Sequence, residues 1–210
     1  LKPWLDLRKR QGYSIEVVST EDIYRCFGDG SLNPEDLKRF LKHVYQSWRP
    51  SPPTYVLLLG EARWDYWYYL KTDVPNLVPS YHPVPAYCSD NWYACVSGED
   101  ALPDYLISRI SVADATAAGV ALGKMIDYEE NPQPGAWWGK ILFLSDNENT
   151  FEEESDRQIR QRIPPSYQTT HLRVREFPFV DNYYMSEPVR LEKEAKYSPQ
   201  CNQTTLEHLE

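Results

Sequence analysis

The clearest periodic pattern of hydrophobic and polar positions lies between residues 33 and 48. Its apolar side chains recur at i, i+3, i+4, i+7, i+8 and i+11, which is the spacing of one helical face; they are Leu37, Phe40, Leu41, Val44, Tyr45 and Trp48. Asn33 can cap this helix, and Pro34 suits its first turn. The pattern therefore predicts an amphipathic helix that starts directly after Asn33.

Short apolar runs separate the predicted helices. The run "YVLLLG" (55–60) is apolar on both faces, which is typical of a strand in the middle of a parallel sheet. Further strands are predicted by β-branched or aliphatic residues at the following positions: Ile15, Val17 and Val18, then 105–111, 139–146 and 171–177. The first of these strands follows a helix with a basic end that stops at Gly12.

Three further helices alternate with these strands. The first spans 114–132 with Asp114 as its cap, the second covers about ten residues from Glu152, and the third begins at Thr204. Alternation of strands and helices predicts an α/β sandwich with a mostly parallel sheet. Ligands bind beyond the carboxyl ends of such strands; these ends are Gly60-Glu61, Ser111 and Ser145-Asp146-Asn147.

Charge and motifs exclude several classes of protein. A net charge of −9 argues against nucleic acid as a partner, because phosphate binding needs clustered Lys and Arg. No apolar run has the ~20 residues of a membrane-spanning helix. The glycine motifs of nucleotide-binding loops and of serine hydrolases do not occur. The sequence starts without Met or a leader, so we expect it to be a piece of a longer protein.

The cysteines show no metal-binding spacing. Cys26, Cys88, Cys95 and Cys201 form no CxxC pair, which makes a zinc site unexpected. Cys88 and Cys95 could form a disulfide in an oxidising compartment, or remain two free thiols. The four histidines are scattered through the chain, with no HExxH motif.

Six phrases, read in order, carry a resemblance to a known family. They are "LKPWLDLRKRQGYSIEVVS", "LNPEDLKRFLKHVY", "PPTYVLLLGEA", "VPSY" with "YCSDNWYACVSGEDALPDYLISRISV", "KMIDYEENP" and "WGKILFLSDN". Together they resemble the gingipain-like cysteine peptidases, which share the caspase-like fold. The resemblance implies a three-layer α/β/α sandwich with a mostly parallel sheet.

The resemblance also implies two subdomains. The first would cover residues 1–134, and the second, catalytic one would begin in 135–210. The family carries its catalytic histidine in a Gly-His-Gly motif, with the nucleophilic cysteine further on. This chain has no such motif, so we expect the second subdomain to be truncated before the catalytic His and Cys, and this fragment to be inactive.

Site residues follow from the resemblance. "ESDRQ" resembles the segment around the acid that binds a basic substrate side chain, which points to Asp156. The alternative is that Asp156 only occupies the first turn of a helix, where acids favour the helix dipole. The acid that orients the catalytic histidine corresponds to Asp146 or Glu152.

The loop before residue 105 has two interpretations. In the family such acids help to bind structural calcium, and Asp90, Asp100 and Asp104 would supply the hard oxygen ligands that Ca²⁺ prefers. The alternative is a solvated acidic loop that Arg109 ties to the sheet. Calcium would be structural, and we expect no cofactor for catalysis.

The leading hypothesis is a secreted or cell-surface cysteine endopeptidase with protein or peptide substrates. A second hypothesis is a catalytically inactive relative that serves as a binding or assembly module, because fold does not fix function. A nucleotide- or sugar-binding α/β domain is the third, and no motif supports it.

Overall fold

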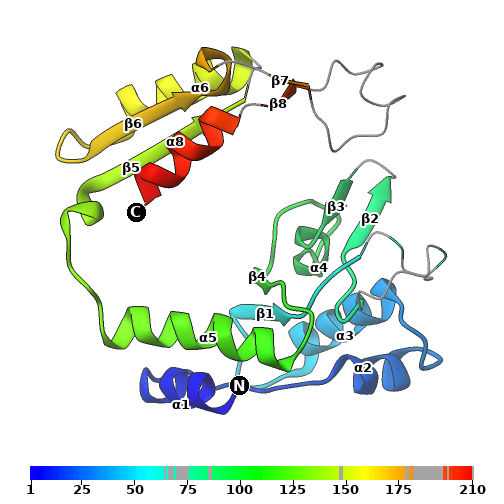
Figure 1. Ribbon diagram of the computed structural model, residues 1–210. Helices are drawn as coiled ribbons and strands as arrows, with labels where there is room; N and C mark the ends of the chain where they lie inside the picture. The colour runs from blue at the N-terminus through cyan, green and yellow to red at the C-terminus, as the bar shows by residue number, and fades with distance from the viewer. Residues whose placement is uncertain are drawn as a thin grey trace. The chain divides into compact units, whose positions relative to one another are not determined.

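The computed structural model describes residues 1–63, 65, 69, 76–84, 87–146, 149–177, 180–181, 196–197 and 199–209 (Figure 1). The chain divides into two units, Leu1–Pro132 and Gln133–Glu210. Each unit combines helices with one pair of parallel strands.

Helices make up much of the first unit. They are α1 (Lys2–Arg10), α2 (Thr20–Phe27), α3 (Pro34–Ser47), α4 (Asn91–Ala94) and α5 (Ala115–Glu130). The predicted helix caps are confirmed: the Asn33 side chain accepts a hydrogen bond from the Glu35 N–H, and Asp114 accepts one from Ala117. Helix α2 was not predicted, although Ser19 caps it by accepting from the Asp22 N–H.

Strands β1 (Tyr55–Leu59) and β4 (Leu106–Ile110) run parallel, and β2 (Tyr81–Val84) pairs antiparallel with β3 (Tyr87–Ser89). The predicted central position of the first strand is wrong, since within the described residues β1 pairs with β4 alone. Its first residue, Tyr55, is 60% exposed. A run that is apolar on both faces therefore does not guarantee neighbours on both edges.

The strand predicted at Ile15, Val17 and Val18 is also wrong. These residues form no strand in the structure, and both valines are exposed. β-Branched residues favour a strand only where a neighbouring strand completes the ladder and one face is buried. Neither condition is met among the described residues here.

The core of the first unit lies between α2, α3, α4 and the parallel pair. Its buried side chains are Ile23, Leu37, Leu41, Leu58, Val78, Tyr93, Ala94, Val96 and Tyr105. Two tyrosine hydroxyls inside this core donate to backbone oxygens, Tyr93 to Pro79 (2.7 Å) and Tyr105 to Leu41 (2.8 Å). Burial of these polar tips is therefore compensated.

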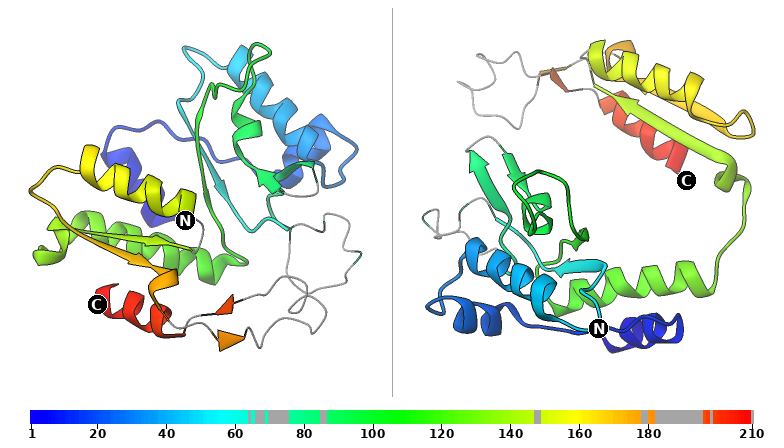
Figure 2. Two further views of the ribbon diagram at one scale, coloured as in Figure 1. Left: turned by 90° about the horizontal axis from the view of Figure 1, so that it is seen from above. Right: turned by 180° about the vertical axis from the view of Figure 1, so that it is seen from behind.

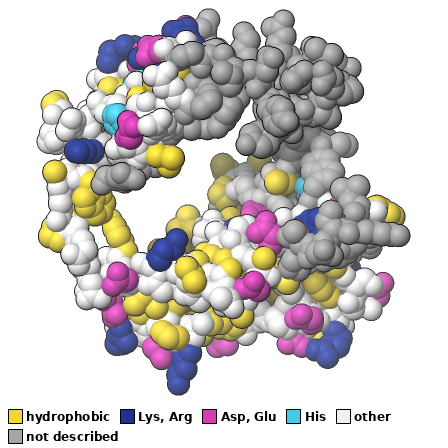
Figure 3. Space-filling view, in the orientation of Figure 1, with side chains coloured by type: hydrophobic (Ala, Val, Ile, Leu, Met, Phe, Trp, Pro, Cys, Tyr) yellow, Lys and Arg dark blue, Asp and Glu magenta, His cyan; other side chains and the backbone are white. Residues whose placement is uncertain are grey.

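Helices α1 and α5 lie side by side, joined by hydrogen bonds from Arg8 to the Glu129 carboxylate (Figure 1). Hydrophobic side chains gather over α5 in the space-filling view (Figure 3), and three of its apolar residues, Val120, Met125 and Tyr128, are exposed. Leu122 is buried on this helix. Helix α5 is therefore an outer helix.

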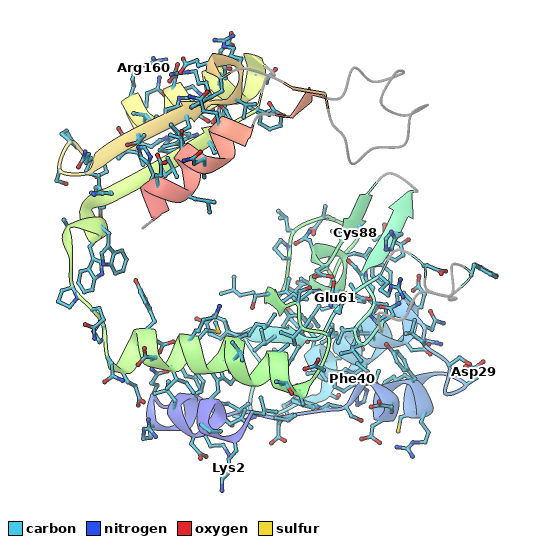
Figure 4. The ribbon with its side chains drawn as sticks, viewed as in Figure 1. Lys2, Asp29, Phe40, Glu61, Cys88 and Arg160 are labelled. Atoms are coloured by element: carbon cyan, nitrogen blue, oxygen red, sulfur yellow. The ribbon has the colours of Figure 1, made fainter. Side chains whose placement is uncertain are left out.

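The chain leaves β1 through Gly60, which has φ +149° and lies against the next segment. A Cβ at Gly60 would lie 2.8 Å from the Leu77 Cβ and 3.0 Å from the Val78 Cγ2. Glu61 follows (labelled in Figure 4), and its backbone N–H donates to the Val112 oxygen at 2.9 Å. This junction therefore needs both a rare backbone angle and the absence of a side chain.

Replacing Gly60 with alanine should lower the free energy of unfolding by about 2–4 kcal/mol, since backbone strain and a steric clash add. Gly12→Ala is the matched control: Gly12 also has positive φ (+92°), but nothing lies within 4 Å of its added Cβ. Its cost should stay near 1 kcal/mol. Urea denaturation measures both, and equal losses would contradict the clash.

The second unit has three layers. Strands β5 (Lys140–Ser145) and β6 (Gln168–Arg173) run parallel. Helices α6 (Asn149–Gln161) and α8 (Pro199–Leu209) lie on opposite faces of this pair in every view (Figures 1 and 2). The described part of this unit also contains the short helices η1 (Ala136–Gly139) and η2 (Val174–Glu176) and the antiparallel strands β7 (Val180–Asp181) and β8 (Lys196–Tyr197).

The last two predicted helices exist, but both begin earlier than predicted. Helix α6 begins at Asn149 rather than Glu152, and α8 begins at Pro199 rather than Thr204. Asn147, the last residue of the predicted strand tip, lies outside the described residues.

Candidate functional site at the carboxyl end of β5

The candidate site lies where β5 ends, on the sheet face that α6 covers. Residues two apart in a strand share a face, so His171 and Arg173 of β6 point the same way. The parallel register pairs Ser145, the last residue of β5, with Arg173. Glu152 and Asp156 are four residues apart on α6, hence on one side of it. The two strands and the helix bring these five side chains together.

A chain of hydrogen bonds links three of these residues. The Ser145 Oγ lies 2.8 Å from the His171 Nε2, and the His171 Nδ1 lies 3.0 Å from the Asp156 Oδ1. This is the order of atoms found in serine hydrolases. However, Ser145 is only 3% exposed, so among the described residues its Oγ is buried rather than presented to a substrate carbonyl. We therefore assign the chain of bonds a positioning role.

Arg173 joins the same carboxylate. Its Nη2 donates to the Asp156 Oδ1 at 2.6 Å, and its other nitrogens lie 3.9 Å from a Glu152 oxygen and 3.5 Å from a Glu176 oxygen. The hydrogen bond from His171, assisted by the positive charge of Arg173, holds the pKa of Asp156 below its ordinary value despite partial desolvation. Asp156 is therefore an anion held by two donors.

Glu152 is nearly inaccessible, at 3% exposure, and its carboxylate forms an ion pair with Arg175. Within the described residues its Oε1 has no hydrogen-bond donor. Asp146, the other candidate for orienting a catalytic histidine, directly follows β5 and is exposed. Both acids lie near the carboxyl end of β5, and the choice between them stays a prediction.

The sequence interpretation missed His171 and Arg173, which it left among scattered histidines and strand residues. One signal was present: the segment "HLRV" (171–174) alternates polar and apolar residues, which places the side chains of His171 and Arg173 on one face of the strand. What no pattern could reveal is the register that sets them opposite β5 and under α6.

The three predicted calcium ligands have separate partners. The Asp90 carboxylate accepts two hydrogen bonds from Arg109 at 2.7 Å, the Asp104 Oδ2 accepts from the N–H groups of Val96 and Ser97, and the Asp100 Oδ1 accepts from Leu102. The described residues hold no group of three or more His, Cys, Asp or Glu side chains that could bind a metal ion. The structure thus does not bring the three acids together.

Arg109 ties the acidic loop to the sheet. Besides Asp90, it donates to the carbonyl oxygens of Gly60 (2.8 Å) and Val78 (2.7 Å). Burial alone would raise the pKa of Asp90, but the hydrogen bonds and charge of Arg109, with help from Ser80, lower it below the ordinary value. This geometry matches the alternative in which Arg109 anchors the loop.

The cysteines of this region are free thiols. Cys88 is exposed on β3 (labelled in Figure 4), and Cys95 follows α4, where its Sγ donates to the Asn91 oxygen.

In the part of the chain that the structure describes, no helix is long and apolar enough to cross a membrane.

Protonation of Asp156 at low pH should remove the stabilisation that this carboxylate gives to the fold. Because its folded pKa lies below the unfolded value of about 3.9, this carboxylate stabilises the fold fully above that value and stops doing so as the pH falls through the folded pKa. We expect the stability difference between wild type and Asp156→Asn to shrink from about pH 6 to about pH 2. Urea midpoints measured across that range test this, and a constant difference would contradict it.

Comparison with known proteins identifies the class. A mixed α/β fold with parallel strands is consistent with the caspase-like fold of cysteine peptidases, and the family comparison decides the class. The family model of peptidase family C25 matches residues 1–210, so the chain belongs to this family of gingipain-like cysteine peptidases. The resemblance and the α/β fold class expected from the sequence are confirmed. No curated protein and no solved structure matches the chain.

Proposed function

We propose that the protein works as a gingipain-like cysteine endopeptidase that hydrolyses peptide bonds through a cysteine thiolate and a histidine base. The observation that carries this proposal is the match to the peptidase family along all 210 residues. The inactive binding module has no comparable support.

The part of this chain in the reaction is substrate positioning. Asp156 would receive the Arg or Lys side chain that precedes the cleaved bond, because a carboxylate binds such groups through charge-assisted hydrogen bonds. Its 32% exposure leaves it accessible, in contrast to Ser145. Asp146 or Glu152 would orient the catalytic histidine. We further propose secretion or display at the cell surface. We also propose structural calcium in the loop of Asp90, Asp100 and Asp104, where the ion would compete with the partners that these acids have in the structure.

The test compares the 210-residue chain with the polypeptide extended beyond Glu210. Each is incubated with a mixed peptide library under reducing conditions, with and without calcium, and the cleavage sites are read by mass spectrometry. The proposal expects the extended protein to cut after Arg or Lys, and alkylation of its thiols to abolish the cuts. The proposed structural calcium also predicts that added calcium raises the thermal stability of the extended protein.

A folded extended protein that cuts no peptide would overturn the peptidase proposal and favour the binding module. Cuts that survive alkylation would point to a different nucleophile. Cuts without preference for basic residues would keep the peptidase but remove the role proposed for Asp156.

A further inference from the structure

The Asp156 carboxylate is already occupied by the chain's own cation. Its Oδ1 accepts from the Arg173 Nη2 at 2.6 Å and from the His171 Nδ1 at 3.0 Å. Both of these hydrogen bonds from described residues fall on the Oδ1. With side-chain exposures of 32% for Asp156 and 24% for Arg173, the pair lies at the surface of the site rather than beneath it. A cation from solution can reach the same carboxylate.

Arg173 also has other acids to turn to. Glu176 lies 3.5 Å from its Nη1, and Glu152, which pairs with Arg175, lies 3.9 Å from its Nε. A guanidinium with three acidic neighbours can give up one of them at modest cost, because the other two retain it. His171 stays on the Oδ1 and, being 6% exposed and bonded to Ser145, keeps the carboxylate in place.

We propose that Arg173 is a specificity-determining residue: it is an internal ligand of Asp156 that a cationic substrate side chain must displace. This inference rests on the proposed function for its meaning in catalysis. Binding of a guanidinium or ammonium group then involves exchange of one ion pair for another, so the site favours basic substrates less than a lone carboxylate would. Removal of Arg173 should strengthen binding of cations, not weaken it.

A competing Arg173 and a merely structural Arg173 predict opposite changes in the affinity for a cationic ligand when this side chain is removed. If Arg173 only held α6 against β6, its loss would loosen the site and weaken every ligand. If it competes for Asp156, its loss should tighten a cationic ligand about fivefold, the scale expected for a partly exposed ion pair. The direction of the change therefore separates the two roles.

The experiment measures binding of agmatine, a small guanidinium compound, to the 210-residue chain by titration calorimetry. Arg173→Gln should bind agmatine about fivefold more tightly than wild type. Asp156→Asn, alone or combined with Arg173→Gln, should show no binding of agmatine. Arg157→Gln is the matched control, because Arg157 lies next to Asp156 on α6 but pairs with Glu154. This variant should bind agmatine with the affinity of wild type.

Weaker or unchanged agmatine binding by a folded Arg173→Gln would overturn the inference. If that variant fails to fold, nitrogen-15 NMR of wild-type arginine side chains replaces it. Saturating agmatine should then shift the Nε–H signal of Arg173 and leave that of Arg157 in place; an unmoved Arg173 signal would overturn the inference equally.

Failure of the proposed function gives a different pattern. An extended protein that cleaves nothing, while Arg173→Gln still binds agmatine more tightly, would remove the peptidase and retain the competition at Asp156. Selective cleavage after basic residues, with no effect of Arg173→Gln on agmatine binding, would retain the peptidase and remove the competition at Asp156.

Discussion

Replacing Arg109 with alanine should lower the free energy of unfolding of the first unit by about 3–5 kcal/mol, the largest loss we expect from one substitution. Arg109 is 12% exposed and donates to Asp90 and to two carbonyl oxygens. Its removal would leave a partly buried carboxylate without its cation, and the oxygens of Gly60 and Val78 without this donor. Desolvated groups that lose a partner cost far more than a surface ion pair gains.

Arg25→Ala is the control for this loss. Arg25 is 71% exposed and pairs with Asp22 in the same helix, so its removal should cost less than about 1 kcal/mol. Urea denaturation followed by tyrosine and tryptophan fluorescence compares the two variants. Similar midpoints for both would show that Arg109 is not the anchor of the loop. A calcium-dependent midpoint in wild type would instead favour the calcium interpretation.

Replacing Asp156 with asparagine should lower kcat/KM for peptides with Arg or Lys before the cleaved bond by about 100-fold in the extended protein. Asparagine keeps the size of the side chain but removes the charge that a basic group needs when it leaves water. Peptides with a neutral residue at that position should lose far less. The ratio of the two kcat/KM values is therefore the measurement, since it cancels general damage to the enzyme.

Glu154→Gln controls for the loss of one negative charge on α6. Glu154 lies two residues from Asp156 and also pairs with an arginine, Arg157, but it is on the exposed side of the helix. Its substitution should change the ratio less than about twofold, because salt screens an exposed charge. An equal effect of both variants would mean that Asp156 acts only through long-range charge.

Local sequence patterns predicted the helices well where caps and periodicity agree. Asn33 and Asp114 cap helices as predicted, because a cap involves only residues a few positions apart. The same reasoning could have found α2, since Ser19 and Asp22 have the spacing of a capping box. The strand expected at Val17 and Val18 failed because a strand depends on a distant partner that local composition does not provide.

The candidate site was predictable in part. Asp146, Glu152 and Asp156 were named from a resemblance, and the structure places Glu152 and Asp156 side by side over β6. His171 and Arg173 were not named, because they meet Asp156 from 15 and 17 residues away along the chain. Similarly, Asp90, Asp100 and Asp104 looked like one ligand group in the sequence, but separate partners engage them in the structure.

By itself, the sequence determined the family, the α/β class, most helices and the acids from which a cation site could be built. These depend on residue identity and on spacing within one or two turns of chain. Only the tertiary structure decided that Arg173 and His171 share one oxygen of Asp156, and that Arg109 engages Asp90. The reason is physical: a charge acts on whatever lies within a few ångströms, and strand register and helix packing determine which residues those are.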